Sequence, residues 1–191
     1  MENNLTAQKA ALRTHCLSLR NSLGNAQKKE LDAALCREIA VHPFFQKADI
    51  LLTYCAVRGE PDLSPLLEIA RERGIKTAFP RCEGKQMTFH VVQDTGELQQ
   101  GRFGILTPSA NAPLACTTPN TLCLLPALAA TESGMRLGYG GGFYDRFLPN
   151  YNGHTLLPIY EMLILPTLPC EKTDIRAQVI LTEKGVLYPY A

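Results

Sequence analysis

The segment Leu122-Cys123-Leu124-Leu125-Pro126 opens the most apolar stretch of the chain, which continues through residue 130. The whole stretch, residues 122–130, is nine residues long and contains a proline, so it is too short to cross a bilayer. Its first four residues are continuously apolar, as expected of a strand that is covered on both faces. We therefore predict a buried central strand from Leu122 to Leu125.

Helical and strand patterns alternate on both sides of this strand. Short apolar runs predict strands at residues 50–55, 77–79, 87–92, 155–159 and 179–181. Apolar stripes predict helices at residues 6–22, 25–40, 62–74 and 143–148, with Asn25 and Asp62 as N-caps and Gly74 ending the third. Residues 100–115 are predicted to form a loop. The alternation indicates an α/β fold, a single three-layer domain over residues 1–191 with a mainly parallel central sheet flanked by helices.

The composition indicates a globular protein and excludes some classes of function. Apolar residues make up 46% and charged residues 19%, and the net charge of +1 favours neither nucleic acid nor an acidic membrane as a partner. The seven cysteines are odd in number and lack a C-x-x-C pair, which predicts reduced side chains and no zinc site. Because no secretory signal is visible either, we expect a cytoplasmic monomer that acts on small molecules.

The candidate chemistry is concentrated in RLGYGGGFYDR, residues 136–146. Four of the five residues 138–142 are glycines, a costly composition unless backbone N–H groups must crowd around a ligand. Because the segment follows the apolar strand and opens a predicted helix, we expect its amides to bind an anion, with Arg136 as a second donor. Asp145 would place beside it a carboxylate, the ligand type that Mg²⁺ prefers. The alternative is a flexible turn at a tight strand-to-helix corner.

Two familiar nucleotide-binding patterns are absent. A G-x-G-x-x-G fingerprint beginning at Gly138 would need a glycine where Phe143 stands. A Walker A loop needs G-K-[ST], but Gly84-Lys85 is followed by Gln86. The glycine-rich segment therefore follows neither standard pattern.

Lys9 and Arg13 form a second candidate anion site. They lie four residues apart on the predicted first helix, so their side chains are neighbours and repel each other weakly. An anion between them would reverse the sign of that interaction. Taken alone, the pair is better explained as part of a solvated helix face.

Together these motifs resemble the 5-formyltetrahydrofolate cyclo-ligase family, also called methenyltetrahydrofolate synthetase. The family pattern K-x-x-L-R is found at residues 9–13, and G-E at Gly59-Glu60. An apolar strand ending in proline is found at residues 124–126, followed by R-L-G-x-G-x-G-[YF]-Y-D at residues 136–145. Near the C-terminus, Asp174 follows Pro169. The resemblance covers nearly the whole chain, and residues 136–145 are its specific part.

The resemblance implies that 5-formyltetrahydrofolate and ATP are converted, with Mg²⁺, to 5,10-methenyltetrahydrofolate, ADP and phosphate. Such a phosphoryl transfer needs positioning and charge neutralisation more than a protein nucleophile. The implied folate contacts are Glu60, Arg13 and Tyr139. The implied metal ligands are Asp145 and Asp174. The implied ATP-binding residues are Lys9, Arg13, Arg136, Leu137, Gly138, Tyr139, Gly140, Gly141, Gly142, Phe143 and Tyr144.

Arg136 and Tyr144 are the implied catalytic residues, with the Tyr144 phenol orienting the formyl or phosphoryl group. Considered without the family, Tyr144 is better explained as a half-buried core aromatic, and Asp174 as a cap. The sequence also departs from the family pattern: Ala130-Thr131 stands where Phe-Asp is common, and Tyr139 where arginine is common.

Two other functions stay open on the sequence alone. One is an enzyme similar to sugar-phosphate isomerases, which would use Glu60 or Asp145 as a base and need no ATP. The other is a diverged phosphate- or nucleotide-binding protein without catalytic activity, since the departures weaken the folate side more than the ATP side.

Overall fold

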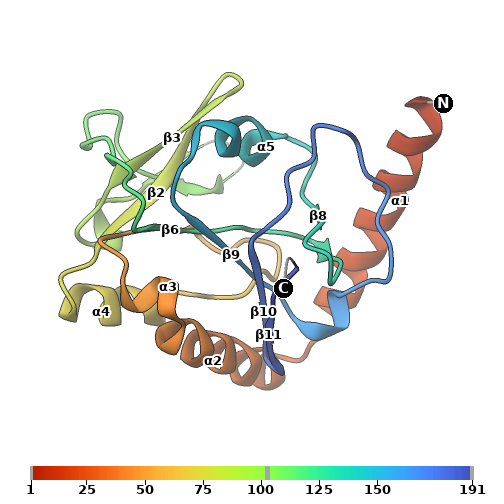
Figure 1. Cartoon of the computed structure of the whole chain (residues 1–191), viewed down its shortest axis with the longest axis horizontal. Coiled ribbons are helices and arrows are strands. Elements are labelled where there is room, and N and C mark those ends of the chain that lie inside the picture. Colours follow the sequence, from red (N-terminus) through yellow and green to blue (C-terminus); the bar gives the residue numbers. More distant parts are fainter. Residues whose placement is uncertain (1, 102–103, 190–191) are drawn as a thin grey trace.

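The computed structural model, which describes residues 2–101 and 104–189, is built on a seven-stranded sheet (Figure 1). Neighbouring strands are parallel from β2 to β10, and each edge strand pairs antiparallel with its neighbour. The predicted α/β class with a mainly parallel sheet is therefore confirmed. In spatial order the strands are β11 (Gly185–Leu187), β10 (Val179–Thr182), β9 (His154–Pro158), β6 (Thr121–Leu124), β1 (Ile50–Leu52), β2 (Lys76–Glu83) and β3 (Gln86–Val91).

Helices cover both faces of the sheet. Figure 1 shows α2, α3 and α4 on one face, α5 on the other, and α1 at the side of the molecule beside β8. No helix in the described part of the chain has the length and hydropathy needed to span a membrane. The α-helices are α1 (Glu2–Asn21), α2 (Asn25–Val41), α3 (Pro43–Gln46), α4 (Pro65–Glu72) and α5 (Phe143–Phe147); the 3₁₀ turns are η1 (Thr95–Glu97), η3 (Leu148–Asn150) and η4 (Glu161–Leu163).

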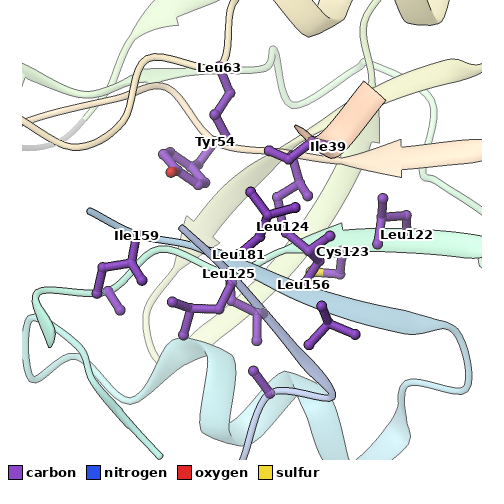
Figure 2. Close-up of a cluster of buried hydrophobic side chains, with 14 of the residues drawn as sticks. Ile39, Tyr54, Leu63, Leu122, Cys123, Leu124, Leu125, Leu156, Ile159 and Leu181 are labelled. Carbon is purple, nitrogen blue, oxygen red and sulfur yellow. The ribbon is translucent and has the colours of Figure 1, made fainter. Parts of the chain in front are cut away.

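Strand β6 lies at the centre of the core, as its continuous apolar sequence predicts. All of its residues are buried, and it pairs in parallel with β1 on one side and β9 on the other. Figure 2 shows Leu122, Cys123 and Leu124 packed among side chains from neighbouring elements, including Ile39 of α2 and Leu156 of β9. Because both faces of β6 are buried, its sequence does not alternate between apolar and polar residues.

Several predicted boundaries differ from the structure. Strand β1 ends at Leu52, earlier than predicted, whereas β2 extends to Glu83 and forms an antiparallel hairpin with β3. The predicted loop at residues 100–115 contains the short paired strands β4 (Gln99–Gln100) and β5 (Leu106–Thr107), while its residues 102–103 lie outside the described part. The sequence did not predict β11 or the small hairpin of β7 (Ala129–Ala130) and β8 (Arg136–Leu137).

The predicted N-caps are also corrected. Gly24 holds the N-cap position of α2 and gives no side-chain cap, so Asn25 is the first helical residue. Ser64 is the N-cap residue of α4, and Asp62 instead accepts the Ser64 N–H at 3.0 Å in a turn before the helix. Gly74 follows the last turn of α4 with φ +72°, so the predicted end of that helix is confirmed.

Candidate functional site

The glycine-rich segment connects β8 to α5, which corrects the expectation that it follows the central strand directly. The hairpin of β7 and β8 lies between, and α5 has only five residues. Two of its glycines adopt a left-handed backbone conformation that favours glycine, Gly140 with φ +96° and Gly142 with φ +62°. The segment is thus a shaped turn, and its anion-binding capacity depends on side chains from other elements more than on a long helix dipole.

Arg13 of α1 packs directly on this turn. Its Nε donates to the carbonyl oxygen of Gly138 at 2.8 Å. A Cβ atom on Gly140 would lie 3.3 Å from the Arg13 guanidinium, so glycine permits the close approach. The remaining guanidinium nitrogens are available to an anion beside the turn.

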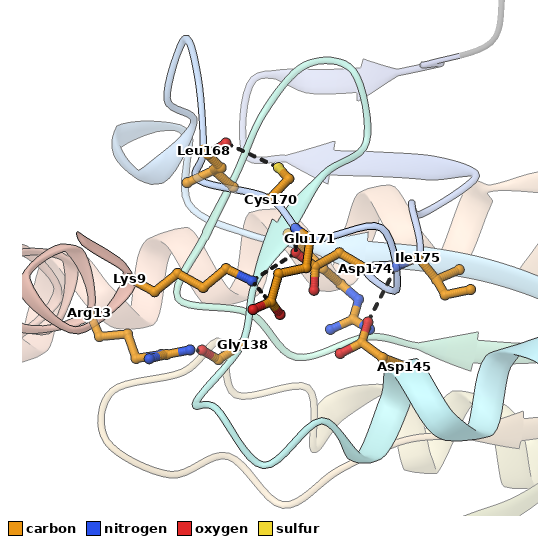
Figure 3. Close-up of polar contacts among 10 residues, drawn as sticks. Lys9, Arg13, Gly138, Asp145, Leu168, Cys170, Glu171, Asp174 and Ile175 are labelled. Atoms are coloured by element: carbon orange, nitrogen blue, oxygen red, sulfur yellow. Dashed lines mark hydrogen bonds and ion pairs between the residues drawn. The ribbon is translucent and has the colours of Figure 1, made fainter. Parts of the chain in front are cut away.

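Lys9 is buried one helical turn earlier, which excludes the solvated helix face for this residue. Its Nζ donates to Asp174 at 2.8 Å and to Glu171 at 3.2 Å (Figure 3). Burial lowers the pKa of the Lys9 ammonium, but the hydrogen bonds and charges of the two carboxylates outweigh it, so the pKa is raised. Lys9 is therefore a fixed cation close to the glycine-rich turn.

Arg136 and Asp145 form a second ion pair in the same region. Arg136 Nη2 lies 2.6 Å from Asp145 Oδ1, and the backbone N–H of Ile175 donates to the same oxygen at 3.3 Å. Because Ile175 is the neighbour of Asp174, the two predicted metal ligands come from segments that touch each other (Figure 3).

The two aspartates fit a magnesium ion that is shared with phosphates. Within residues 2–101 and 104–189, no group of three or more His, Cys, Asp or Glu side chains is arranged to hold a metal by itself. Mg²⁺ is commonly bound through one or two carboxylates, with phosphate and water oxygens completing its shell. Asp145 and Asp174 match that donor set.

The other residues of the segment divide between backbone and side-chain roles. The Leu137 side chain is buried in the core, and the Phe143 ring is covered by the Arg146 guanidinium at 5.1 Å from its centroid. Arg146 also donates to the Gly141 carbonyl at 2.9 Å. At Leu137 and Gly141, a nucleotide could therefore contact backbone atoms but no side chain.

Two tyrosine hydroxyls near Glu60 are buried and have no hydrogen-bond partner, those of Tyr54 and Tyr144. Burial raises the pKa of both phenols well above the ordinary value, with the Glu60 charge as a further cause. The Arg136 guanidinium lies 5.8 Å from the Tyr144 ring centroid, and its Nε is likewise unpartnered. Unpaired buried donors are uncommon in proteins and call for a ligand or water.

Glu60 is 3% exposed and accepts the backbone N–H of Val57 at 2.9 Å. It lies after β1, at the carboxyl edge of the parallel strands, where α/β proteins bind their ligands. Glu60 also lines a cavity of about 430 Å³ together with Tyr54, Leu63 and Phe79. A buried carboxylate beside open space is suited to a ligand that presents N–H donors.

Tyr139 connects the glycine-rich turn to Glu60, and Arg20 is the functional candidate that the sequence analysis missed. The Tyr139 hydroxyl accepts from Arg20 Nη1 at 2.9 Å, and it is also near enough to Glu60 to lower the pKa of that carboxyl. Arg20 follows Arg13 by seven residues and Lys9 by eleven, so all three share one face of α1. That spacing was the available signal.

Ala130 and Thr131, which depart from the family pattern, do not face open space. Ala130 is fully buried in β7, and the Thr131 hydroxyl accepts the Met135 N–H at 3.2 Å within the β7–β8 hairpin. These positions support the hairpin that carries Arg136.

Comparison with known proteins identifies the family of the chain. The model of the 5-formyltetrahydrofolate cyclo-ligase family matches residues 5–183. The chain belongs to this family. The cyclo-ligase of Escherichia coli (strain K12) is 26% identical over 177 residues, covering 87% of this chain and 96% of its own length.

Two solved structures resemble this cyclo-ligase family member. The Aquifex aeolicus 5,10-methenyltetrahydrofolate synthetase superposes with a TM-score of 0.83 at 28% identity, over 96% of this chain and 93% of its own. The Mycoplasma pneumoniae 5,10-methenyltetrahydrofolate synthetase has a TM-score of 0.74 at 19% identity and covers 92% and 98%, which supports the fold alone. The resemblance to the cyclo-ligase family that the motifs predicted is thus confirmed.

Proposed function

We propose that the protein converts 5-formyltetrahydrofolate to 5,10-methenyltetrahydrofolate, using ATP and Mg²⁺ and releasing ADP and phosphate. The observation that carries this proposal is that α1 places two cations in one region: Arg13 bonds to the glycine-rich turn, and Lys9 bonds to Asp174, beside the pair of Arg136 and Asp145. Cations beside a shaped glycine turn, with carboxylates next to them, suit a polyphosphate and its metal. Family membership supplies the substrate class.

The reaction has two bond-forming steps. A formyl oxygen attacks the γ-phosphorus of ATP, the bond to the ADP oxygen breaks, and the formyl carbon becomes an activated imidate phosphate. N10 then attacks that carbon, loses its proton, and expels phosphate to close the ring. Neither step needs a protein nucleophile, which agrees with a site composed of cations, backbone amides and phenols.

The residues of the site divide the work between the two substrates. Lys9, Arg13 and Arg136 would hold the phosphates and neutralise charge that builds up during transfer. Asp145 and Asp174 would hold Mg²⁺, which would supply positive charge to neutralise the phosphates. The phosphates of ATP and the formyl group of the folate would therefore meet beside Arg136.

The phenols and Glu60 complete the folate side. The unpartnered Tyr144 hydroxyl is suited to hydrogen-bond the formyl or phosphoryl oxygen, and Glu60 to accept N–H groups of the pterin. Both groups lie beside the turn that carries Arg136, so the formyl group and the γ-phosphate would be brought together.

One assay tests the proposal and separates the alternatives. Purified protein is mixed with 5-formyltetrahydrofolate, ATP and Mg²⁺, and formation of the methenyl product is followed by its absorption. We expect product only when ATP is present, with one ADP released per product. ATP binding without product would indicate a diverged nucleotide-binding protein, and turnover of a sugar phosphate without ATP would indicate an isomerase.

A further inference from the structure

Arg20 is a buried arginine without a directly bonded carboxylate. Its side chain is 2% exposed, yet none of the ion pairs in residues 2–101 and 104–189 includes it. Its guanidinium donates to the Tyr139 hydroxyl and to the Ala127 carbonyl, while Nε has no partner. A fully buried charge is rare in proteins unless another charge balances it.

The balancing charge is Glu60, which Arg20 reaches through Tyr139. A guanidinium has only donors, so the Tyr139 hydroxyl must accept from Arg20, and its own proton is left free to donate. The Glu60 carboxylate is the nearby acceptor for that proton, because the Tyr139 hydroxyl is among the groups that lower the pKa of Glu60. The phenol is therefore placed to connect a buried cation to a buried anion.

The packing around this bridge leaves little freedom. A Cβ atom on Gly59, the residue before Glu60, would lie 3.1 Å from both Cγ and Cδ of Arg20, so the arginine stem packs against Gly59. The Tyr139 ring also has the Arg58 guanidinium over its face, 5.6 Å from the centroid. The ring and both charged groups are thus held by neighbours from α1 and from the loop after β1.

We propose that Arg20 is a positioning residue which, through the Tyr139 hydroxyl, holds the Glu60 carboxylate charged and in one orientation. Arg20 itself is too deeply buried to bind substrate, so it acts on the site only through Tyr139. Where it names folate as the ligand of Glu60, this inference rests on the proposed function. It also accounts for a tyrosine at position 139, because a phenol both accepts from Arg20 and donates to Glu60.

Glu60 is surrounded by groups that act in opposite directions. Burial raises its pKa, and the Val57 N–H, the Tyr139 hydroxyl and the charges of Arg20 and Arg58 lower it without outweighing the burial. The neutral phenols Tyr54 and Tyr144 also face it. Loss of the Tyr139 hydroxyl removes one of the groups that lower the pKa of Glu60, so the proton affinity of Glu60 should increase.

The test measures the titration of Glu60 in the free protein. Isotope-labelled glutamate is followed by NMR against pH, and the Glu60 signal is assigned by its loss in Glu60→Gln. We expect Tyr139→Phe to raise the Glu60 titration midpoint by about one pH unit, roughly tenfold in proton affinity. Tyr151→Phe is the matched control, because its buried phenol donates only to the carbonyls of Thr121 and His154 and should leave the midpoint unchanged.

Two arginine variants separate positioning from structural support. Arg20→Lys keeps a donor for Tyr139 and should move the Glu60 midpoint less than Arg20→Met, which keeps only the apolar stem. If Arg20→Met does not fold, Tyr139→Phe and Arg20→Lys still decide the question. An unchanged Glu60 midpoint in folded Tyr139→Phe would overturn the inference.

Binding of 5-formyltetrahydrofolate tests the substrate part separately. Its affinity for the wild type should fall as the pH drops through the Glu60 midpoint, and in Tyr139→Phe that fall should begin about one pH unit higher. A shifted Glu60 titration in a protein that binds no 5-formyltetrahydrofolate would support the bridge and overturn the proposed function.

Discussion

The Lys9 ammonium lies 2.8 Å from Oδ2 of Asp174, a residue 165 positions later in the chain. The pair joins a side chain expected to bind phosphate to one expected to bind metal, and Arg136 and Asp145 repeat the relationship at 2.6 Å. In the protein without ligands the two sets of charges therefore neutralise each other. Binding of a nucleotide together with its metal would replace each internal pair by a pair with the ligand, so metal and nucleotide should depend on one another for affinity.

Asp174→Asn should separate the effects of phosphate and metal. The substitution removes the nearer of the two carboxylates paired with Lys9, so ATP without Mg²⁺ should bind about 5-fold more tightly, for an ion pair worth ~1 kcal/mol. The increase in ATP affinity that Mg²⁺ gives to the wild type should be lost. Calorimetry with and without Mg²⁺ measures both effects.

Glu171→Gln is the control for that variant, because it removes the other, more exposed carboxylate bonded to Lys9. It should retain the dependence on Mg²⁺. Equal dependence on Mg²⁺ in the two variants would show that Asp174 has no special place in the metal site.

Lys9→Ala should act on the nucleotide alone. Loss of a buried ammonium beside the glycine-rich turn should raise KM for ATP by about tenfold, the effect of one charged hydrogen bond. KM for the folate should change little, because no contact of Lys9 reaches Glu60. Steady-state kinetics with each substrate varied in turn test this, with the exposed Arg71→Ala as a control; a change confined to the folate KM contradicts the role.

The central strand and the order of the motifs were predictable because their signals are local. Residues 122–125 are all apolar, without alternation. The motif at residues 136–145 can be recognised from its own sequence, without knowledge of its neighbours in space. Strands of two or three residues, such as β7, β8 and β11, were missed. Such strands depend on a partner strand to exist, and nothing in so short a run distinguishes them from loop.

The site residues were predictable by type but not by their partners. Lys9 and Arg13 were recognised as cations on one helix face, but the pairing of Lys9 with Asp174 depends on a contact between distant segments. Arg20 was missed for the same reason. An arginine near the end of a polar helix gives no local sign of burial, and only its spacing from Arg13 indicates a shared face.

Asp145→Ala should abolish turnover. The side chain pairs with Arg136 and is one of two carboxylates suited to the metal, so its loss removes both a metal ligand and the orientation of an arginine beside the phosphates. We expect activity to fall by at least about a hundredfold while the protein remains folded. Asp49→Ala is the control, because the Asp49 carboxylate accepts from the hydroxyls of Thr118 at 2.7 Å and Thr121 at 3.5 Å and from none of the site residues. Near-normal turnover of Asp145→Ala would count against the assignment.

Glu60→Gln should gain stability relative to the wild type as the pH rises toward neutral, while it weakens folate use. The pKa of Glu60 in the folded protein is raised above its ordinary value of 4.5, so folding favours the protonated carboxyl. The resulting stabilisation is fully present below pH 4.5 and is lost as the pH rises through the raised pKa. Glutamine avoids that loss, so the Tm of the variant relative to that of the wild type should rise from acid to neutral pH, by about 2–4 °C per kcal/mol for a chain of this size. Thermal unfolding from acid to neutral pH checks it; a Tm difference that is constant across that range would refute the mechanism.

Gly140→Ala should weaken ATP binding beyond its effect on stability. Position 140 has φ +96°, and the new Cβ would lie 3.3 Å from the Arg13 guanidinium, which must then shift by a few tenths of an ångström. Gly74→Ala is the matched control, because Gly74 has φ +72° and no atom within 4 Å of the added carbon. Both variants should lose about 1–2 kcal/mol of stability from left-handed strain. Only Gly140→Ala should also lose about tenfold in ATP affinity, because it alone displaces a phosphate-binding group; equal ATP affinity in the two variants would mean that Arg13 does not bind the nucleotide from its position on this turn.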